Sequence, residues 1–238
     1  MPPGAIRRLV RRLGFDIGVY PAKTSPWPKL VALLQRHRVT LVLDIGANTG
    51  QYALRLREHG YSGRIVSYEP QSAAHAELTL RAAGDPLWEI APRAAVGAEA
   101  GEITINLSAE SDMSSALPMT EEAVRHFTSA RTVATERAPV VTLADEIARR
   151  AGPIDRVFVK SDTQGFEAQV LGGLGQAIER VVGLQLELSL HPIYQGQPRY
   201  LEMLQRLEAA GFAPLLLIPG YWSRHHERML EFDVVAFR

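Results

Sequence analysis

The chain has 238 residues, of which 46% are hydrophobic and 22% charged, the composition of a globular protein with a sizeable core. Basic and acidic residues balance at 26 each, so the basic excess of a typical nucleic-acid-binding protein is missing. The absence of cysteine excludes disulfides, thiolate metal sites and a cysteine nucleophile. No apolar run approaches the roughly 20 residues of a membrane span, and the N-terminus lacks the apolar core of a secretory signal. We therefore expect a cytoplasmic protein without a transmembrane segment and without a nucleic-acid partner.

Residues 1–28 are predicted to form an amphipathic helix and a proline-punctuated connector. In a helix over 4–13, four apolar side chains share one face and four arginines lie opposite: Ile6, Leu9, Val10 and Leu13 against Arg7, Arg8, Arg11 and Arg12. Such a helix suits peripheral contact with an anionic membrane surface. Packing on the domain itself, or on a second copy in a homodimer, is the alternative that we favour.

Residues 29–238 alternate between strands and helices, which predicts one domain with a mostly parallel sheet covered by helices on both faces. After a helix over 29–37, the expected strands are 40–45, 64–69, a third region within 88–97, 156–162 and 181–190. The expected helices between and after them are 50–59, 72–83, 142–150, 166–180 and 198–210. Two final strands, 213–218 and 231–237, have no helix between them, so an antiparallel hairpin is expected at one edge of the sheet.

A polar stretch interrupts this alternation. The segment 102–107 alternates like a half-exposed strand, and the following residues 108–138 contain few periodic apolar positions. We interpret 108–138 as a loop or lid with a short helix near 120–130.

The turn after the first strand, "DIGANTG" at 44–50, indicates a cofactor site. Ligands of open α/β sheets bind beyond the carboxyl ends of the strands, and Gly46 and Gly50 allow a close approach there. Glu69 ends the second strand, where an acid would reach ribose hydroxyls. Asn48 takes the place of the second glycine of a dinucleotide motif, and Asp44 would repel a pyrophosphate. Asp44 suits the amino group of S-adenosylmethionine better, although an NAD-dependent oxidoreductase remains an alternative.

Two acids in the second half of the chain are candidate catalytic residues. Asp162 in "VKSDTQGFE" and Glu187 in "LQLELSLHPIYQGQ" both fall late in predicted buried strands. Buried carboxylates are costly unless they are paired, protonated or bound to a metal. They are candidates either for Mg²⁺ ligands or for a general base with its electrostatic partner. The alternative is a structural role, in which the carboxylates cap helices or pair with Lys160 or an arginine. His191, just beyond, could deprotonate an acceptor hydroxyl at neutral pH.

Several ordered motifs, beginning with "LVLDIGANTGQYALRLREHGYSGRIVSYEP" and ending with "FDVVAFR", resemble the FkbM-type methyltransferase family. The resemblance covers roughly residues 30–238. It implies a Rossmann-like class I methyltransferase domain with a seven-stranded sheet, and an S-adenosylmethionine-dependent O-methyltransferase activity. Carried over by position, Asp44, Gly46, Asn48 and Gly50 form the cofactor turn and Glu69 holds the ribose, while Ala94 and Ala95 lie near the adenine. Ser161, Ala144 and His191 depart from the family pattern.

Family members methylate hydroxyls of sugars, glycolipids, polyketides and related products, so the resemblance leaves the acceptor open. Tyr194, Tyr221 and Trp222 offer flat faces of the kind on which sugars stack, although aromatic residues in loops more often serve local packing. We expect a saccharide or glycoconjugate acceptor, with a polyketide or other small natural product as the alternative. A non-catalytic partner subunit is a further alternative, which the retained acids at 44, 69 and 162 disfavour.

Overall fold

The computed structural model describes residues 25–109, 111–126, 131–223 and 227–238. The amphipathic helix predicted over 4–13 lies outside these residues. Within the described part, every helix is too short or too polar to cross a bilayer.

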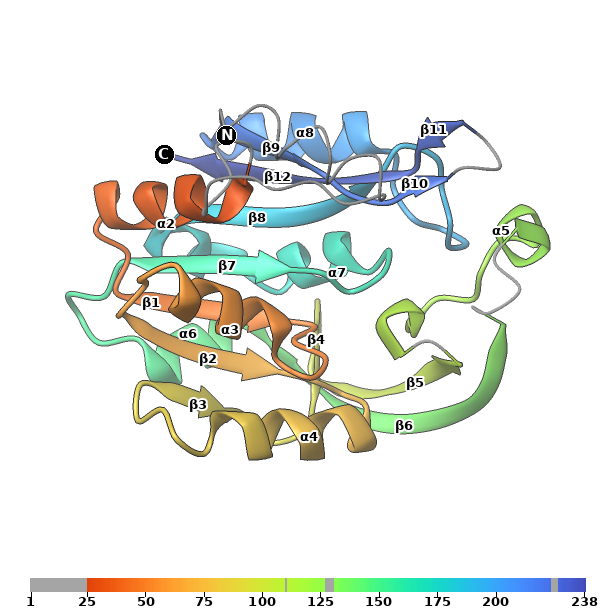
Figure 1. The fold of residues 1–238 in the computed structure, drawn as a ribbon, viewed down its shortest axis with the longest axis horizontal. Helices are drawn as coiled ribbons and strands as arrows, with labels where there is room; N and C mark the ends of the chain where they lie inside the picture. Colours follow the sequence, from red (N-terminus) through yellow and green to blue (C-terminus); the bar gives the residue numbers. More distant parts are fainter. Residues whose placement is uncertain (1–24, 110, 127–130, 224–226) are drawn as a thin grey trace, which may run out of the picture.

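The main sheet has seven strands in the order β3-β2-β1-β7-β8-β12-β9 (Figure 1). Their bounds in chain order are Leu41–Ile45 (β1), Arg64–Tyr68 (β2), Trp88–Ile90 (β3), Val157–Ser161 (β7), Val181–Ser189 (β8), Ala213–Pro219 (β9) and Glu231–Phe237 (β12). Of the seven, β12 runs antiparallel to both of its neighbours, β8 and β9, and the other pairings are parallel. The strand order reverses between β1 and β7, which is where open α/β sheets bind ligands.

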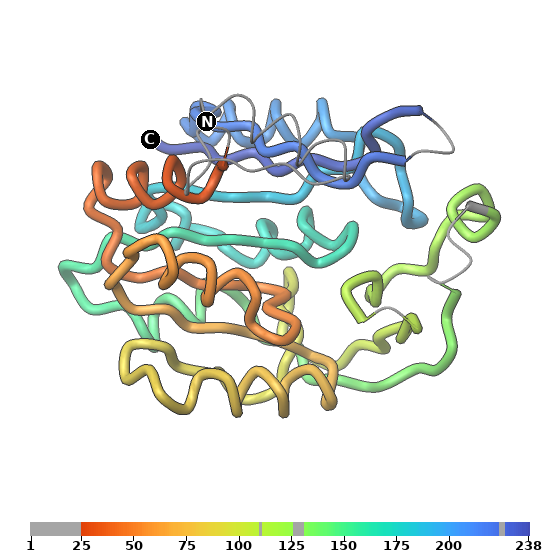
Figure 2. Tube along the Cα trace, in the orientation of Figure 1, coloured from red at the N-terminus to blue at the C-terminus, as the bar shows by residue number. Residues whose placement is uncertain are grey.

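Helices cover both faces of this sheet, so its central strands are buried on both sides (Figure 2). One face is covered by α2 (Pro26–Arg36), α3 (Gln51–Glu58) and α4 (Ser72–Ala82), and the other by α6 (Leu143–Arg150), α7 (Glu167–Gly172) and α8 (Tyr200–Ala209). Side chains of β1 alternate between these two cores: Leu41, Leu43 and Ile45 enter one, and Val42 the other. This period of two is what a strand dictates, and burial on both faces explains the nearly continuous apolar run in the sequence.

A second sheet of three strands, in the order β4-β6-β5, lies beside the main one. It consists of Ala95–Gly97 (β4), Gly101–Ser108 (β5) and Thr132–Thr142 (β6), where β5 and β6 pair antiparallel. Between β5 and β6 the chain forms the short helices Ser111–Met113 (η1) and Glu121–His126 (α5). We call residues 111–126 the cover segment, because they lie at the carboxyl ends of the main strands (Figure 1).

The class of fold predicted from the sequence is confirmed, and so is an antiparallel pair at one edge of the sheet. The pair differs in detail from a simple hairpin: β12 is inserted between β8 and β9, and the short strands Trp222–Ser223 (β10) and Arg228–Met229 (β11) lie between β9 and β12 along the chain. The first described helix begins at Pro26 and not at 29, since proline is well placed in a first helical turn.

Three other segments differ from the sequence prediction. The region 88–97 contributes to two sheets, with β3 in the main sheet and β4 in the small one. Residues 132–138 belong to β6 and not to a loop, because a half-exposed strand needs few apolar positions. The helix expected over 166–180 ends after Gly172 and is followed by a 3₁₀ helix, Gly175–Arg180 (η3). At Gly173 a Cβ would lie 2.2 Å from the carbonyl oxygen of Gly97, so this close contact requires glycine.

Candidate active site

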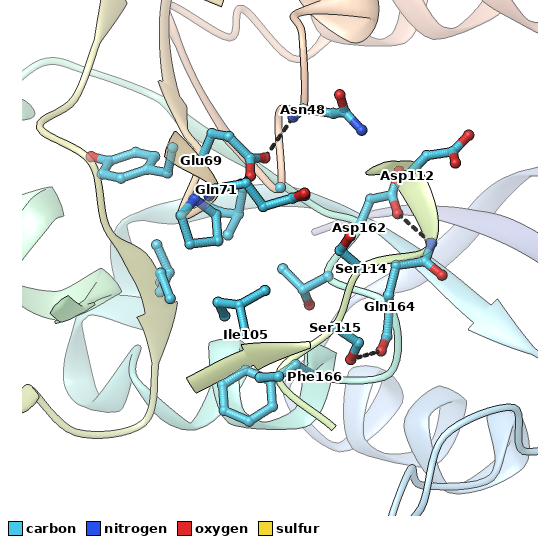
Figure 3. Close-up of a pocket in the computed structure, with 18 of the residues that line it drawn as sticks. Asn48, Glu69, Gln71, Ile105, Asp112, Ser114, Ser115, Asp162, Gln164 and Phe166 are labelled. Atoms are coloured by element: carbon cyan, nitrogen blue, oxygen red, sulfur yellow. Dashed lines mark hydrogen bonds between the residues drawn. The ribbon is translucent and has the colours of Figure 1, made fainter. Parts of the chain in front are cut away.

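A cavity opens at the carboxyl ends of β1, β2 and β7, at the point where the strand order reverses (Figure 3). One part of its lining is apolar and comes from Ile45, Ala94, Ala95, Val96, Ile105 and Phe166. Another part is polar and comes from the cover segment and the turn after β7: Ser111, Asp112, Ser114, Ser115, Thr163 and Gln164. Glu69 and Gln71 lie on one side of the cavity, and Asp162 and Gln164 on the other (Figure 3).

The turn after β1 is shaped by left-handed backbone at Gly46, Asn48 and Gly50, with φ of 73°, 47° and 93°. A Cβ on Gly46 would lie 1.9 Å from the carbonyl oxygen of Asp162, so glycine lets the two turns touch. A Cβ on Gly50 would lie 2.7 Å from the indole of Trp88. Of these three residues, Gly46 and Asn48 line the cavity, whereas Gly50 packs behind it as the N-cap of α3.

Glu69 reaches the cavity from the end of β2 in a fixed position. One carboxylate oxygen accepts the backbone N–H of Asn48 at 2.8 Å and the other accepts the backbone N–H of Gln71 at 2.9 Å. Only 2% of Glu69 is exposed, and this burial raises the pKa of the carboxyl to about 7 although the two N–H donors oppose the shift. Because an ionised carboxylate accepts about four hydrogen bonds, Glu69 retains acceptor capacity toward the cavity.

Asp44, predicted to contact a cofactor amino group, is not among the residues that line the cavity. Its side chain is fully buried, and it accepts a hydrogen bond from Ser67 at 3.1 Å. Lys160 Nζ lies 3.2 Å from Asp44 Oδ1, donates to the carbonyl oxygen of Gly46 at 3.1 Å, and lies 3.5 Å from Asp162 Oδ2. Burial disfavours the charge of Lys160, but the carboxylates of Asp44 and Asp162 outweigh it and raise the pKa of Lys160. Asp44 therefore holds the ammonium group of Lys160, which also contacts the turns after β1 and β7 through Gly46 and Asp162.

Asp162 lies at the end of β7 with 38% of its side chain exposed, and it lines the cavity. The amide nitrogen of Gln164 donates to Asp162 Oδ1 at 3.2 Å and to Glu187 Oε2 at 2.7 Å. The two acids singled out in the sequence are thus brought to the same amide group. Glu187 does not line the cavity itself.

Four further carboxyl groups, Glu167, Glu187, Glu231 and Asp233, face Asp162, and we call them the acid cluster. Loss of hydration raises the pKa of all four, and the negative charge of Asp162 adds to the shift. The resulting pKa is about 7 for Glu167 and Glu231 and about 6 for Asp233, and that of Glu187 is well above its ordinary range. Protons on several of these groups therefore reduce the negative charge near neutral pH.

The pair Asp162 and Glu187 does not fit the predicted Mg²⁺ site. Within the described residues, no group of three or more histidine, cysteine, aspartate or glutamate side chains is arranged to hold a metal ion. The Gln164 amide nitrogen takes the position between the two carboxylates, and it presents N–H donors where a cation requires oxygen lone pairs.

Of the other predicted site residues, some line the cavity and others do not. Ala94 and Ala95 line the cavity, and their contact with an adenine stays a prediction. His191 is exposed and is not among the lining residues. Tyr194 is only 1% exposed, so its ring is no stacking surface, and its hydroxyl donates to Gln164 Oε1 at 2.7 Å.

Tyr221, just before β10, and Trp222, its first residue, are by contrast 52% and 58% exposed, and neither lines the cavity. Their predicted contact with a substrate is therefore not built into this cavity.

Sequence reasoning named Lys160 only as a possible ion-pair partner of the two acids and assigned no role to Gln164 or Ser115. Lys160, in β7, and Gln164, in the following turn, flank Asp162, so the motif "KSDTQG" contained the signal. Gln164 lies two positions beyond Asp162, and both residues line the same cavity. Ser115 contacts the site through the fold alone, since its hydroxyl donates to the carbonyl oxygen of Gln164 at 2.6 Å across 49 residues of sequence.

Comparisons with known proteins agree with this architecture. A family model described as "Methyltransferase FkbM domain" matches residues 44–214. Among solved structures, the METTL16 MTase domain is similar with a TM-score of 0.50 and 8% identity, covering 89% of this chain and 64% of that chain. At this identity the likeness shows the fold alone, and this chain spans less than two thirds of that chain's length.

Two further solved structures are similar at lower TM-scores. Cofactor-bound Rv0187 from MTB has a TM-score of 0.48 and 15% identity, covering 100% of this chain and 90% of that chain. A human methyltransferase 10 domain containing protein has a TM-score of 0.46 and 10% identity, covering 99% of this chain and 96% of that chain. No curated protein sequence matches this chain significantly.

Proposed function

The chain belongs to the FkbM methyltransferase family, and we propose that it is an S-adenosylmethionine-dependent O-methyltransferase acting on a hydroxyl of a saccharide or glycoconjugate. The observation that carries the proposal is the cavity at the reversal of strand order, with Glu69 on one side and Asp162 on the other. This arrangement supports the proposal, because Glu69 could accept ribose hydroxyls and Asp162 could accept a reacting proton in the same cavity.

The residues present fit the cofactor. Its adenine is flat and apolar, which suits Ala94, Ile105 and Phe166, and its ribose offers two hydroxyls to the fixed carboxylate of Glu69. When bound, S-adenosylmethionine supplies a methyl group on a positively charged sulfur. A cavity bordered by carboxylates favours a cation over the pyrophosphate of NAD, so the family and the site both speak against an oxidoreductase.

Asp162 is the residue that we assign to the proton. A hydroxyl that accepts a methyl group forms an oxygen–carbon bond and must release its proton, while the electrons of the broken carbon–sulfur bond remain on sulfur. Asp162 is partly exposed, lines the cavity and can accept this proton. The Lys160 ammonium, 3.5 Å from its carboxylate, limits the repulsion from Asp44 and from ionised members of the acid cluster.

The polar lining supports a saccharide acceptor. Asp112 adds a carboxylate to the cover-segment side of the lining. The hydroxyls of Ser111, Ser114 and Ser115 hydrogen-bond to Asn48, Ser108 and Gln164, and they make this wall polar. A polar wall matches a ligand with many hydroxyls better than the apolar surface of a polyketide.

The test is methyl transfer from labelled S-adenosylmethionine to a panel of mono- and oligosaccharides, with polyketide alcohols as the comparison set. We expect Asp162→Asn to lower turnover by roughly 10²- to 10⁴-fold while the Kd of S-adenosylhomocysteine changes less than about threefold. His191→Ala, at an exposed position outside the lining, should retain turnover. A large loss in His191→Ala with normal turnover in Asp162→Asn would move the base to His191. Cofactor binding without transfer to any acceptor would favour a non-catalytic partner subunit.

A further inference from the structure

Gln164 makes more connections between separate parts of the site than its neighbours do. Its side-chain nitrogen donates to Asp162 and Glu187, at 3.2 and 2.7 Å. Its side-chain oxygen accepts from the Tyr194 hydroxyl at 2.7 Å, and its backbone oxygen accepts from the Ser115 hydroxyl at 2.6 Å. One residue therefore links the end of β7, strand β8, the loop after β8 and the cover segment.

We propose that Gln164 is a positioning residue, whose amide holds Asp162 toward the cavity and ties that carboxylate to the seated cover segment. The inference rests on the proposed function in one respect, the role of Asp162 as the proton acceptor. The contacts themselves are independent of that role.

The orientation of the amide follows from its partners. Two carboxyl groups surround one end and a hydroxyl donor faces the other, which assigns nitrogen to the first end and oxygen to the second. Both N–H groups of the nitrogen are then used by acids, and an amide has only two. Gln164 thus occupies the place that a cation would take between Asp162 and Glu187, and it satisfies both without adding charge.

The backbone around Gln164 is fixed as well. Its φ is 55°, in the left-handed region, and the next residue, Gly165, has φ of 92°. A Cβ on Gly165 would lie 3.0 Å from the Cβ and Cδ2 atoms of Tyr194, so the turn packs directly against that ring. A buried tyrosine with its hydroxyl on Gln164 Oε1 prevents the amide from turning away from the acids.

The same tyrosine belongs to the loop that holds the cover segment. Met119 pairs with Tyr194 in an isolated β-bridge, and the Gln195 backbone N–H donates to the Pro118 carbonyl oxygen at 2.8 Å. The Gln195 side chain also donates to the Met119 carbonyl oxygen at 3.0 Å. When the cover segment is in place, Tyr194 and Ser115 both reach Gln164. The contacts that fix Gln164, and through it Asp162, therefore include contacts from the cover segment and from the loop that holds it.

Gln164→Met tests this directly, because methionine keeps the unbranched shape and removes both N–H donors. The matched control is Gln195→Met, which removes another glutamine that fastens the cover segment but contacts neither Asp162 nor Glu187. The first readout is the titration of Glu187, followed by NMR of glutamate labelled with ¹³C in the side-chain carboxyl group. The charged groups that face Glu187 are Asp162, Glu167, Glu231 and Asp233, and both variants retain all of them.

We expect Gln164→Met to raise the Glu187 midpoint by about one pKa unit or more, because a lost N–H donor to a carboxylate disfavours its ionised form. Gln195→Met should leave that midpoint unchanged. Both variants should speed hydrogen exchange of the Thr120 amide, which donates to the Ile193 carbonyl oxygen. An unchanged Glu187 midpoint in Gln164→Met, or an equal shift in Gln195→Met, would overturn the proposal.

Tyr194→Phe is the second variant, and it keeps the ring against Gly165 if Gln164→Met should fail to fold. It removes the hydroxyl that orients the amide, so we expect a smaller upward shift of the Glu187 midpoint, and no shift would count against the proposal. S-adenosylhomocysteine is titrated into the same samples by calorimetry. Absence of binding in the unmodified protein would contradict the proposed function, whereas the Glu187 shift tests Gln164 separately.

Discussion

Replacing Glu69 by glutamine should weaken cofactor binding without unfolding the protein. The substitution retains the shape of a side chain that is 2% exposed and removes its charge. It leaves one acceptor oxygen where the carboxylate has two, one for each of two backbone N–H groups. Each hydrogen bond from a ribose hydroxyl to the carboxylate contributes roughly 1.5–3 kcal/mol. The Kd of S-adenosylhomocysteine should therefore rise by about 10- to 150-fold in calorimetry at pH 8.

The same substitution should change the free energy of unfolding only slightly, because the raised pKa of Glu69 makes its ionised form costly in the folded protein. Burial raises the pKa of Glu69 from 4.5 to about 7, so the folded protein binds a proton more tightly than the unfolded chain. Between about pH 4.5 and 7 the unfolded chain has lost this proton while the folded protein still holds it, so the free energy of unfolding falls over this interval, by about 3 kcal/mol in total. Glutamine avoids this loss, and the N–H group left without an acceptor costs about 1–3 kcal/mol. The two effects nearly cancel at pH 8.

Glu167→Gln provides the matched control. Glu167 is equally buried, has a pKa raised to about 7, and accepts two hydrogen bonds from Thr163, but it does not line the cavity. We expect its thermal stability to change as little as that of Glu69→Gln, with cofactor affinity retained. Normal affinity in Glu69→Gln, or an equal loss in Glu167→Gln, would refute the assignment of Glu69 to the ribose.

The remaining predictions concern the two turns and the acids around them. Gly46→Ala should lower the free energy of unfolding by at least about 3 kcal/mol in urea titrations, because its Cβ would meet the Asp162 carbonyl oxygen. Gly60→Ala is the control: Gly60 has φ of 92° but no described atom beyond its chain neighbours within 4 Å of its Cβ position, so this variant should lose only about 1 kcal/mol. Lys160→Met should cost about 3–5 kcal/mol, since it leaves Asp44 buried without its ion pair. Adding Asp44→Asn should recover much of that loss, and a strictly additive double variant would argue against the pair. The acid cluster has pKa values raised in the folded state, so thermal stability should fall as pH rises from about 4.5 to 7.5, and a rise over that interval would contradict these shifts.

The sequence was sufficient to predict the main sheet, because its buried strands are easily recognised as apolar runs. Buried parallel strands such as Leu41–Ile45 are continuous apolar runs, and Gly50 and Gly60 mark the bounds of the helix between the first two strands. The small sheet was missed in part since β6 is mostly exposed, and a strand with polar side chains on its outer face lacks apolar periodicity.

The sequence predicted which strand ends border the site more accurately than which side chains contact one another there. Glu69 and Asp162 reach the cavity because the topology brings the carboxyl ends of β2 and β7 to one edge. Asp44 also lies near the carboxyl end of its strand, but its side chain forms a buried ion pair with Lys160. Rotamers and pairing across 100 or more residues decide such cases, and sequence spacing does not encode them. The bridging contacts of Gln164 likewise depend on the positions that the fold gives to Tyr194 and Glu187, 30 and 23 residues further along the chain.

The most direct test of the central claim is calorimetric titration of the purified protein with S-adenosylmethionine, S-adenosylhomocysteine and NAD⁺ in parallel. We expect one equivalent of each of the first two ligands to bind with a Kd in the micromolar range, roughly −8 kcal/mol, and NAD⁺ not to bind. Binding of NAD⁺ alone, or of none of the three, would contradict the assignment of the cavity to S-adenosylmethionine.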